Sequence, residues 1–526
     1  MPVPATLDAR SPEVGARLEA DVCIIGGGAA GITLARRLGA RAGRVLLVES
    51  GGWDSSTDAQ SLYADPQSGI PYLPLAGCRL RYFGGSTNHW AGYCRLNQPN
   101  DFTAREDLGR PAWPVSEAEL APYVATAYHD LRLGSEPATD VASVARELRL
   151  PVDSLFERQS QDLRTAVSRI TPGFRFGTEF AADLAVRPAL RVLLNANVVH
   201  LQLKPDGSRL DSIRIRTTTG RELTARARRF VLCCHAIENA RLLLASDDVQ
   251  RSGIGNESGH VGRYFQDHPA VVSGILIPSR AFPALYDAGA MLQRQVDFNV
   301  GFTAERSRQE RILQYFCRFW PIRSSDEVRH ALGRMADGFW RPADLQLLSA
   351  MGVVVRDVPQ AARLTLERMK LVTPLKLAYQ MEHRIEQAPN PASRVTLSDQ
   401  RDSLGNRRAN LAWNLNDVDF RTFEVGQALV IRELSALGVG RFQAPPLTRT
   451  LVSLTVEGRN HHIGTTRMSA TAADGVVDRN CRVHGIENLY LGGSGIFPTS
   501  GDGSPTLLLT AFAMRLADHL ESLGAA

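Results

Sequence analysis

Two adjacent histidines near the C-terminus, in the stretch GRNHHIGTTRM, carry the side chains best suited to acid–base chemistry. A neutral imidazole accepts a proton near pH 7 and then carries the positive charge, which suits it to act as a general base. The flanking residues are expected to be extended, and Gly464 indicates a turn, so His461 and His462 should point to opposite sides. Only one of them then faces a substrate. The pair is not expected to bind a metal, because adjacent residues cannot converge on one ion and no Cys or carboxylate recurs at ligand spacing.

A dinucleotide-binding motif lies near the N-terminus. The stretch ADVCIIGGGAAGITLARRLGARAGRVLLVES predicts a strand, a glycine-rich turn, a helix and a second strand. Gly26, Gly28 and Gly31 have the spacing that permits a tight turn, close approach of a pyrophosphate, and close packing of helix on strand. Glu49 ends the second strand, where its carboxylate can accept hydrogen bonds from both ribose hydroxyls and would repel a 2′-phosphate. The motif predicts one bound FAD or NAD, since no second copy is present.

The composition excludes several functional classes. Of the 526 residues, 44% are hydrophobic and 22% are charged, which is typical of a folded globular chain. The net charge of +5 is small for this length and is not concentrated in any run, so no nucleic-acid partner is expected. No signal peptide and no apolar run of about 18 residues is present, so no transmembrane segment is expected. Seven scattered cysteines are typical of a reducing compartment, and the expected localisation is cytoplasmic.

The rest of the chain predicts an interleaved organisation. Residues 191–234 indicate a β-meander with turns at Asp206-Gly207 and Thr219-Gly220, followed by a helix in ENARLLLAS. A hairpin is expected around Leu404-Gly405, whereas residues near 101–190 and 305–385 are expected to form helices and loops. Because no low-complexity linker divides the chain, its domains should interleave.

Several further motifs carry a family resemblance. They are ESGG, YFGGSTNHWAGYCRL, GHVGRYFQDHP, EQAPNPASRVTL, HHIGTTRM and VHGIENLYLGGSGIFPTSGDGSPTLLLTAFAMRLADHL. These motifs follow one another in the same order as in the glucose-methanol-choline (GMC) flavin oxidoreductases, and the chain resembles that family from about residue 20 to 520. The resemblance implies bound FAD and the oxidation of an alcohol by hydride transfer to flavin N5.

The fold that the resemblance implies is α/β, with a Rossmann-type FAD-binding domain interleaved with a substrate domain that carries an antiparallel sheet and helices. We expect the parts of the FAD-binding domain at residues 15–100, 191–268 and 446–526, the last with the catalytic residues. Residues 101–190 are expected to form a lid or substrate region, and residues 269–445 the substrate-binding domain.

The resemblance also implies cofactor contacts outside the glycine motif. The motifs GGSTNHW and LGGSGIFPT are most similar to those of pyranose oxidase and its sugar-oxidising relatives. In those relatives a histidine at the place of His89 can bond covalently to the flavin methyl group; alternatively, His89 and Trp90 pack around the isoalloxazine. The residues expected at the cofactor, besides Gly26, Gly28, Gly31 and Glu49, are Ser50, Gly85, Ser86, Asn88, His89, Trp90, Ala91, Gly493, Ser494, Pro505 and Thr506.

For the catalytic pair, the resemblance distinguishes the two histidines. The catalytic histidine of the family lies three residues before the glycine of the Gly-Thr step, which is His461 here. The second catalytic residue of the family is His or Asn before Pro-Thr, and this chain has Ser504 instead. A serine there is also explained as the N-cap of a helix with Pro505 at its first position. We expect His461 to perform the proton transfer. His268, in QDHP, is expected to be a packed structural residue.

The predicted function is FAD-dependent oxidation of a small-molecule alcohol, with a sugar or glycoside hydroxyl as the expected substrate. The electron acceptor would be oxygen, a quinone or a redox protein. Two alternatives stay open: a redox-neutral flavoprotein lyase or decarboxylase of the same family, and a flavin-binding partner protein that has lost its activity. The missing second His or Asn makes the redox-neutral alternative more credible.

Overall fold

The predicted strand–helix–strand unit is confirmed in the computed structural model, which describes residues 6–40, 43–134, 137, 140–323 and 376–524. Strand β2 (Arg17–Ile25) leads into helix α1 (Ala29–Leu38), and β3 (Val45–Val48) returns parallel to β2. All four residues of β3 are buried, as are most apolar residues of α1. A parallel pair covered by a helix therefore forms the base of the nucleotide motif.

The first sheet contains this pair at its centre. Its strand order is β1-β7-β3-β2-β10-β9-β8, and β18 pairs with β10. The bounds are β1 Thr6–Asp8, β7 Leu190–Leu194, β8 Asn197–Leu203, β9 Leu210–Arg216, β10 Glu222–Leu232 and β18 Leu489–Leu491. The antiparallel meander is confirmed for β8, β9 and β10.

One part of the meander prediction is wrong. The run from residue 191 to 203 forms two strands, because Asn195 takes a left-handed conformation (φ 56°) between them. The first of these strands, β7, inserts in parallel between β1 and β3. The continuous apolar pattern concealed this change of direction.

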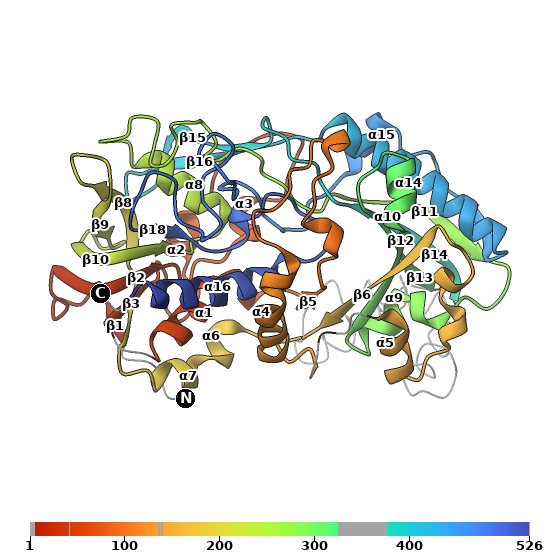
Figure 1. The fold of residues 1–526 in the computed structure, drawn as a ribbon, viewed down its shortest axis with the longest axis horizontal. Helices are drawn as coiled ribbons and strands as arrows, with labels where there is room; N and C mark the ends of the chain where they lie inside the picture. The colour runs from red at the N-terminus through yellow and green to blue at the C-terminus, as the bar shows by residue number, and fades with distance from the viewer. Residues whose placement is uncertain (1–5, 41–42, 135–136, 138–139, 324–375, 525–526) are drawn as a thin grey trace, which may run out of the picture.

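Helices cover the first sheet around the nucleotide motif. The C-terminal helix α16 (Pro505–Ser522) packs against both α1 and α4 (Glu117–Asp130), and Figure 1 shows α16 lying beside α1. Helix α8 (Ala236–Ala245) follows β10 and contacts the three-stranded sheet β15-β16-β4. The strands of that sheet are β4 Gln67–Gly69, β15 Arg394–Arg401 and β16 Arg407–Trp413, which confirms the hairpin around Leu404-Gly405.

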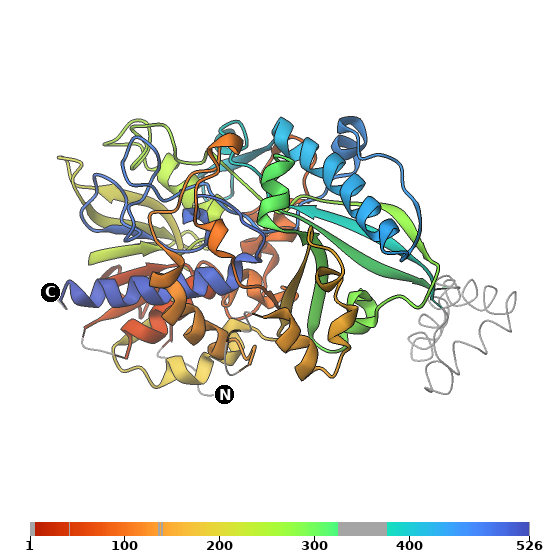
Figure 2. The same ribbon diagram turned by 45° about the vertical axis from the view of Figure 1, so that its right-hand side comes forward.

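A second large sheet lies at the opposite end of the long axis in Figure 1. Its strand order is β17-β11-β14-β13-β12-β6-β5, with antiparallel pairing throughout. Helix α14 (Asp417–Ala436) lies over one face, as Figure 2 shows. The bounds are β5 Tyr93–Cys94, β6 Leu163–Ile170, β11 Ala270–Pro278, β12 Val296–Phe302, β13 Tyr315–Arg323, β14 Lys376–Ile385 and β17 Gly440–Gln443.

The helices and loops predicted for residues near 101–190 and 305–385 are therefore only partly correct. Strands β6, β13 and β14 lie in these regions, and residues 324–375 lie outside the described part of the chain. These strands pair with segments distant in sequence, and such pairing overrides the local pattern. The chain passes repeatedly between the two sheets, while the predicted domain boundaries stay a prediction.

The remaining elements are short, and none of the described helices is both long and apolar enough to cross a membrane. All seven cysteines are unpaired. The helices not yet given are α2 Thr57–Ser61, α3 Leu75–Cys78, α5 Val141–Glu147, α6 Phe176–Glu179, α7 Ala181–Ala185, α9 Ala288–Leu292, α10 Ala304–Gln309 and α15 Arg449–Thr455.

Candidate active site

A cavity of about 540 Å³ is lined by residues of both large sheets and of the C-terminal segment. Most of the residues expected at the site line this cavity: Gly26, Gly28, Glu49, Ser50, Gly85, Ser86, His89, Trp90, Ala91, His461, Gly493, Ser494, Ser504, Pro505 and Thr506. Gly31 and Asn88 do not line it. A Cβ on Gly31 would overlap the carbonyl oxygen of Gly26, and Asn88 donates from Nδ2 to the carbonyl of Phe83 at 2.9 Å. These two residues shape the turns that border the cavity.

The glycine turn presents free backbone to the cavity. Gly26 has φ 107°, and a Cβ there would lie 2.5 Å from the carbonyl oxygen of Cys233, so only glycine fits. A Cβ on Gly28 would have no heavy atom within 4 Å, because this side of the residue faces open space. Gly28 is also the N-cap of α1 and provides no side-chain cap, which leaves the first N–H groups of the helix available. Such a helix start is suited to bind phosphate oxygens.

Glu49 joins the end of β3 to this turn. Its Oε2 accepts a hydrogen bond from the Gly27 N–H at 2.8 Å, and its Oε1 accepts from the Gly51 N–H at 2.8 Å and from Ser50 Oγ at 3.0 Å. The side chain is buried yet still borders the cavity. A carboxylate has about four acceptor positions, so Glu49 keeps capacity for a ribose hydroxyl.

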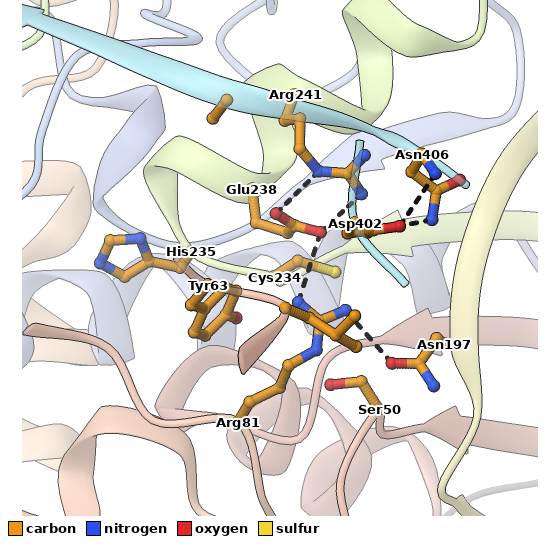
Figure 3. A network of polar contacts seen from close by, with 12 residues as sticks. Ser50, Tyr63, Arg81, Asn197, Cys234, His235, Glu238, Arg241, Asp402 and Asn406 are labelled. Carbon is orange, nitrogen blue, oxygen red and sulfur yellow. Dashed lines mark hydrogen bonds and ion pairs between the residues drawn. The ribbon is translucent and has the colours of Figure 1, made fainter. Parts of the chain in front are cut away.

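A network of charged residues borders the same end of the cavity and was not predicted from the sequence (Figure 3). Arg241 donates two hydrogen bonds to Glu238, at 2.7 and 2.9 Å, and Arg81 lies 3.7 Å from the same carboxylate. Arg81 also donates to Asn197 Oδ1 at 3.3 Å. Burial by itself would raise the pKa of Glu238, but Arg241 and Arg81 outweigh it and lower the pKa to about 2. The network therefore stays charged and holds this wall rigid.

The start of α16 forms another part of the wall. Ser504 is the N-cap and Pro505 follows it, as the sequence predicted, but the Ser504 side chain accepts no capping hydrogen bond. Its hydroxyl has no hydrogen-bond partner within the described residues and borders the cavity. Helix capping thus does not explain this hydroxyl. The helix start also directs partial positive charge at the cavity.

His461 hydrogen-bonds to a second buried histidine, and the geometry assigns the tautomer. Nε2 of His268 lies 2.9 Å from the carbonyl oxygen of Gly501, which can only accept, so this nitrogen carries a hydrogen. In neutral His268 the other nitrogen, Nδ1, is then an acceptor, and it lies 2.8 Å from Nδ1 of His461. His461 must therefore donate from Nδ1, and its Nε2 keeps a free lone pair. No described residue hydrogen-bonds to this Nε2.

His462 uses both of its ring nitrogens. Tyr72 donates its hydroxyl hydrogen to the carboxylate of Asp267 and accepts from Nε2 of His462 at 2.9 Å. Nδ1 of His462 then accepts from Nε2 of His235 at 3.0 Å. Both adjacent histidines contribute to the cavity wall, but their rings take separate partners. Of the pair, His461 alone has a nitrogen able to accept a proton from a substrate.

Asp267 holds the turn that carries His461. Its carboxylate accepts from the backbone N–H groups of Arg459, Asn460 and His461, each at 3.0 Å, and from the His268 N–H at 2.6 Å. Ligand atoms of Asp267, His268 and His461 lie within 4.8 Å of one another. Each of these three side chains takes part in the hydrogen bonds just described. The sequence offered one signal for Asp267, a carboxylate beside a histidine in the motif QDHP.

The surroundings keep these histidines neutral. Burial is the largest cause that lowers the pKa of His461 well below its ordinary value, and His268, Arg384, Arg459 and Arg95 add to it. Burial also lowers the pKa of His268 to about 4. His461 is therefore an unprotonated base at neutral pH.

His89 and Trp90 border the cavity as expected, and the covalent flavin bond at His89 stays a prediction. Burial of His89 lowers its pKa. Trp90 donates from Nε1 to the Phe174 carbonyl at 2.6 Å, which fixes the indole ring at the wall.

Comparison with known proteins identifies the family. Two family models, both described as GMC oxidoreductase, match residues 173–270 and 389–513. The chain belongs to the GMC oxidoreductase family. It is an FAD-dependent oxidoreductase, with the mixed α/β fold and the Rossmann-type FAD-binding domain of GMC proteins.

Relatives of this GMC oxidoreductase match over most of their length. The fructose dehydrogenase large subunit of Gluconobacter japonicus is 23% identical over 96% of this chain and 98% of the relative. The C-glycoside 3-oxidase of Microbacterium trichothecenolyticum is 24% identical over 87% of this chain and 78% of the relative. The crystal structure of formate oxidase superposes with a TM-score of 0.59 and 18% identity, covering 97% of this chain and 99% of that chain.

The cavity fits the GMC cofactor. Because Gly28 has no Cβ, its backbone borders open space that a pyrophosphate can enter. The start of α1 offers N–H groups to that pyrophosphate, and Glu49 has acceptor positions for a ribose. These residues would hold the adenosine diphosphate part. His89, Trp90, Gly493 and the start of α16 border the remainder of the cavity and would hold the isoalloxazine.

Proposed function

We propose that this GMC oxidoreductase oxidises a hydroxyl group of a sugar or glycoside to a carbonyl, with His461 as the catalytic base. The free Nε2 of His461, in the same cavity as the nucleotide turn, carries this proposal. Bound FAD would supply the acceptor for the hydride that leaves the alcohol carbon. The names of two relatives, fructose dehydrogenase and C-glycoside 3-oxidase, support a sugar or glycoside substrate.

Three side chains of the cavity have separate roles: one removes the proton, one orients the base, and one donates a hydrogen bond to the substrate. Nε2 of His461 takes the hydroxyl proton, while His268 accepts the hydrogen bond from Nδ1 and fixes the orientation of the ring. The Ser504 hydroxyl donates to the substrate oxygen, since it borders the cavity and its hydrogen has no acceptor among the described residues. Serine cannot replace His461 as base, so proton removal depends on one side chain.

The test is an anaerobic substrate panel that covers sugars, glycosides and simple alcohols. We expect at least one sugar or glycoside to bleach the visible flavin absorbance in the absence of oxygen. Turnover without bleaching would instead support a redox-neutral lyase or decarboxylase. Re-oxidation of the reduced enzyme by oxygen, a quinone or a redox protein would then identify the acceptor class.

A further inference from the structure

Three arginines form the wall of the cavity that belongs to the second sheet and the adjoining turn. Arg318 lies on β13, Arg384 lies on β14, and Arg459 lies two residues before His461. Among the described residues, no acidic side chain lines this part of the cavity. The acids that pair with the arginines, Asp297 and Glu382, are buried behind them.

The ion pairs leave this wall positive. Glu382 lies 3.0 Å from Arg384, 3.0 Å from Arg459 and 3.7 Å from Arg318, while Asp297 pairs with Arg318 alone. Two buried carboxylates thus face three guanidinium groups. A third acid reaches only Arg459: it is Glu457, at 3.0 Å, and its side chain is 60% exposed, so solvent screens that pair.

Arg384 is the least neutralised of the three arginines. Burial, together with Arg318 and Arg459, lowers its pKa despite Glu382, whereas Asp297 and Glu382 outweigh burial and raise the pKa of Arg318. Among the described residues, Arg384 donates one hydrogen bond, from Nη2 to Glu382, and its Nε, like the Nε atoms of Arg318 and Arg459, is buried without a partner. This guanidinium therefore has donors and uncompensated charge available to a ligand.

The same wall lies beside the proposed base. Arg384, Arg459 and His461 line the same cavity, and the positive charges of the two arginines contribute to the low pKa of His461. Arg459 is also held by its backbone N–H to Asp267, the carboxylate that fixes the His461 turn. A ligand that contacts these arginines can therefore reach His461.

We propose that the substrate carries an oxyanion, as a carboxylate or a phosphate ester, which binds Arg384, Arg459 and Arg318 while the hydroxyl reaches Nε2 of His461. This inference rests on the proposed function, since it assigns the substrate class of the same site. A planar guanidinium binds such an oxyanion through two parallel N–H donors, in a partly dehydrated wall where the pairing is strong. The competing role for these arginines is stabilisation of negative charge on the reduced cofactor.

A binding measurement tests the inference without turnover. Tetrahydropyran-2-carboxylate and tetrahydropyran-2-carboxamide share a sugar-like ring and differ in charge, and neither has a hydroxyl to oxidise. Their dissociation constants for the oxidised holoenzyme are measured from the shift of the flavin absorbance. We expect the carboxylate to bind roughly 10-fold to 100-fold more tightly, as for hydrogen bonds to charged groups.

Variants of Arg384 test whether this residue causes the preference for the carboxylate ligand. Arg384→Gln should abolish the preference for the carboxylate, and Arg384→Lys, which keeps the charge, should restore part of it. Arg441→Gln is the matched control, because Arg441 is exposed on β17 of the same sheet and should leave the preference unchanged. Flavin content and melting temperature check that each variant is folded. Equal binding of the two ligands by the wild type, or a preference that survives Arg384→Gln, overturns the inference.

Anaerobic flavin reduction by glucose, glucuronate and glucose 6-phosphate separates the sources of the oxyanion. A higher kcat/KM for glucuronate identifies a carboxylate, and a higher value for glucose 6-phosphate identifies a phosphate ester. If kcat/KM for glucose equals the values for glucuronate and glucose 6-phosphate, and Arg384→Gln lowers all three equally, Arg384 acts on the cofactor. That result would overturn the inference. Failure of every alcohol to reduce the flavin would instead contradict the proposed function, while the binding preference would still stand.

Discussion

At the scale of single residues, hydrogen-bond partners distinguish two histidines that sequence adjacency leaves equivalent. Tyr72 and His235 occupy both ring nitrogens of His462, whereas His268 occupies only Nδ1 of His461. Family resemblance selected His461 from its distance to Gly464, and the tautomers provide an independent physical reason. His268 is buried, which agrees with the expected packing role, and its Nδ1 also accepts the hydrogen bond from Nδ1 of His461, so under the proposed function it would position the base.

Replacement of Ser504 by alanine separates catalysis from capping. An N-cap bond would contribute about 1 kcal/mol to stability, but the Ser504 side chain makes none. We therefore expect an unchanged melting temperature in Ser504→Ala, together with a roughly 10-fold lower kcat from the lost hydrogen bond to the substrate oxygen. A lower melting temperature with unchanged kcat would show that the hydroxyl serves the helix.

At the scale of elements, part of the site could be predicted because each residue lies in a local motif. Gly26, Gly28 and Glu49 belong to one strand–helix–strand unit, whose geometry is set by short-range sequence. Arg318 and Arg384 could not be placed, because their position depends on the pairing of β13 with β14 and on its register. The local sequence around them predicted helices and loops and gave no indication of these strands.

Asp267 controls the element that carries the base. Asp267→Asn replaces one acceptor oxygen with an NH₂ group, which cannot accept from the backbone N–H groups that face it. The buried N–H donors left unpaired should lower the free energy of unfolding by about 1–3 kcal/mol. We expect a lower melting temperature and a kcat that falls more than KM changes, with FAD retained. Asp399→Asn, at an exposed position, is the control. If Asp267→Asn kept wild-type kcat, Asp267 would not position His461.

The glycine turn allows a matched test of cofactor binding. A Cβ on Gly28 meets no protein atom within 4 Å and enters only the open cavity. Gly28→Ala should therefore fold normally and lose most of its FAD, measured as the ratio of flavin to protein absorbance. Gly15→Ala, away from the cavity, should keep wild-type flavin content. Full FAD occupancy in Gly28→Ala would refute the assigned pyrophosphate position.

At the scale of the whole molecule, the two large sheets exchange chain segments several times and place the cavity residues on both. The β6 and α4 segments show why boundaries were difficult to predict. Both lie within residues 101–190, yet β6 pairs with β12 in the second sheet while α4 packs on α16 beside the first. Composition alone does not reveal such a division.

Buried histidines couple the stability of the whole molecule to pH. Burial is the main cause of a large decrease in the pKa of five histidines from the ordinary value of 6.5: His235 to about 3, His268 and His383 to about 4, and His461 and His462 well below. Burial also lowers the pKa of His89 and His519. The unfolded chain therefore binds more protons at these residues between pH 6.5 and about 4. Their contribution to stability is fully present above pH 6.5 and is lost as the pH falls through this window.

Three buried acids make the stability depend on pH in the opposite direction. Burial raises the pKa of Asp101 and Asp419 to about 7 and also raises that of Glu386, so their contribution grows as the pH falls toward 4. Five histidines outnumber three acids, and each net proton changes the unfolding free energy by about 1.4 kcal/mol per pH unit. We expect the melting temperature of the holoenzyme to fall from pH 6.5 to pH 4. A constant or rising value would contradict the neutral, buried histidines.

Single-turnover flavin reduction in the wild type and in His461→Ala tests most directly whether His461 is the catalytic base. Both holoenzymes are mixed anaerobically with the best alcohol of the panel, and the loss of visible flavin absorbance is followed in time. We expect His461→Ala to retain FAD and to reduce it roughly 10²- to 10⁴-fold more slowly. Reduction of the variant at the wild-type rate would contradict the assignment of His461 as the base.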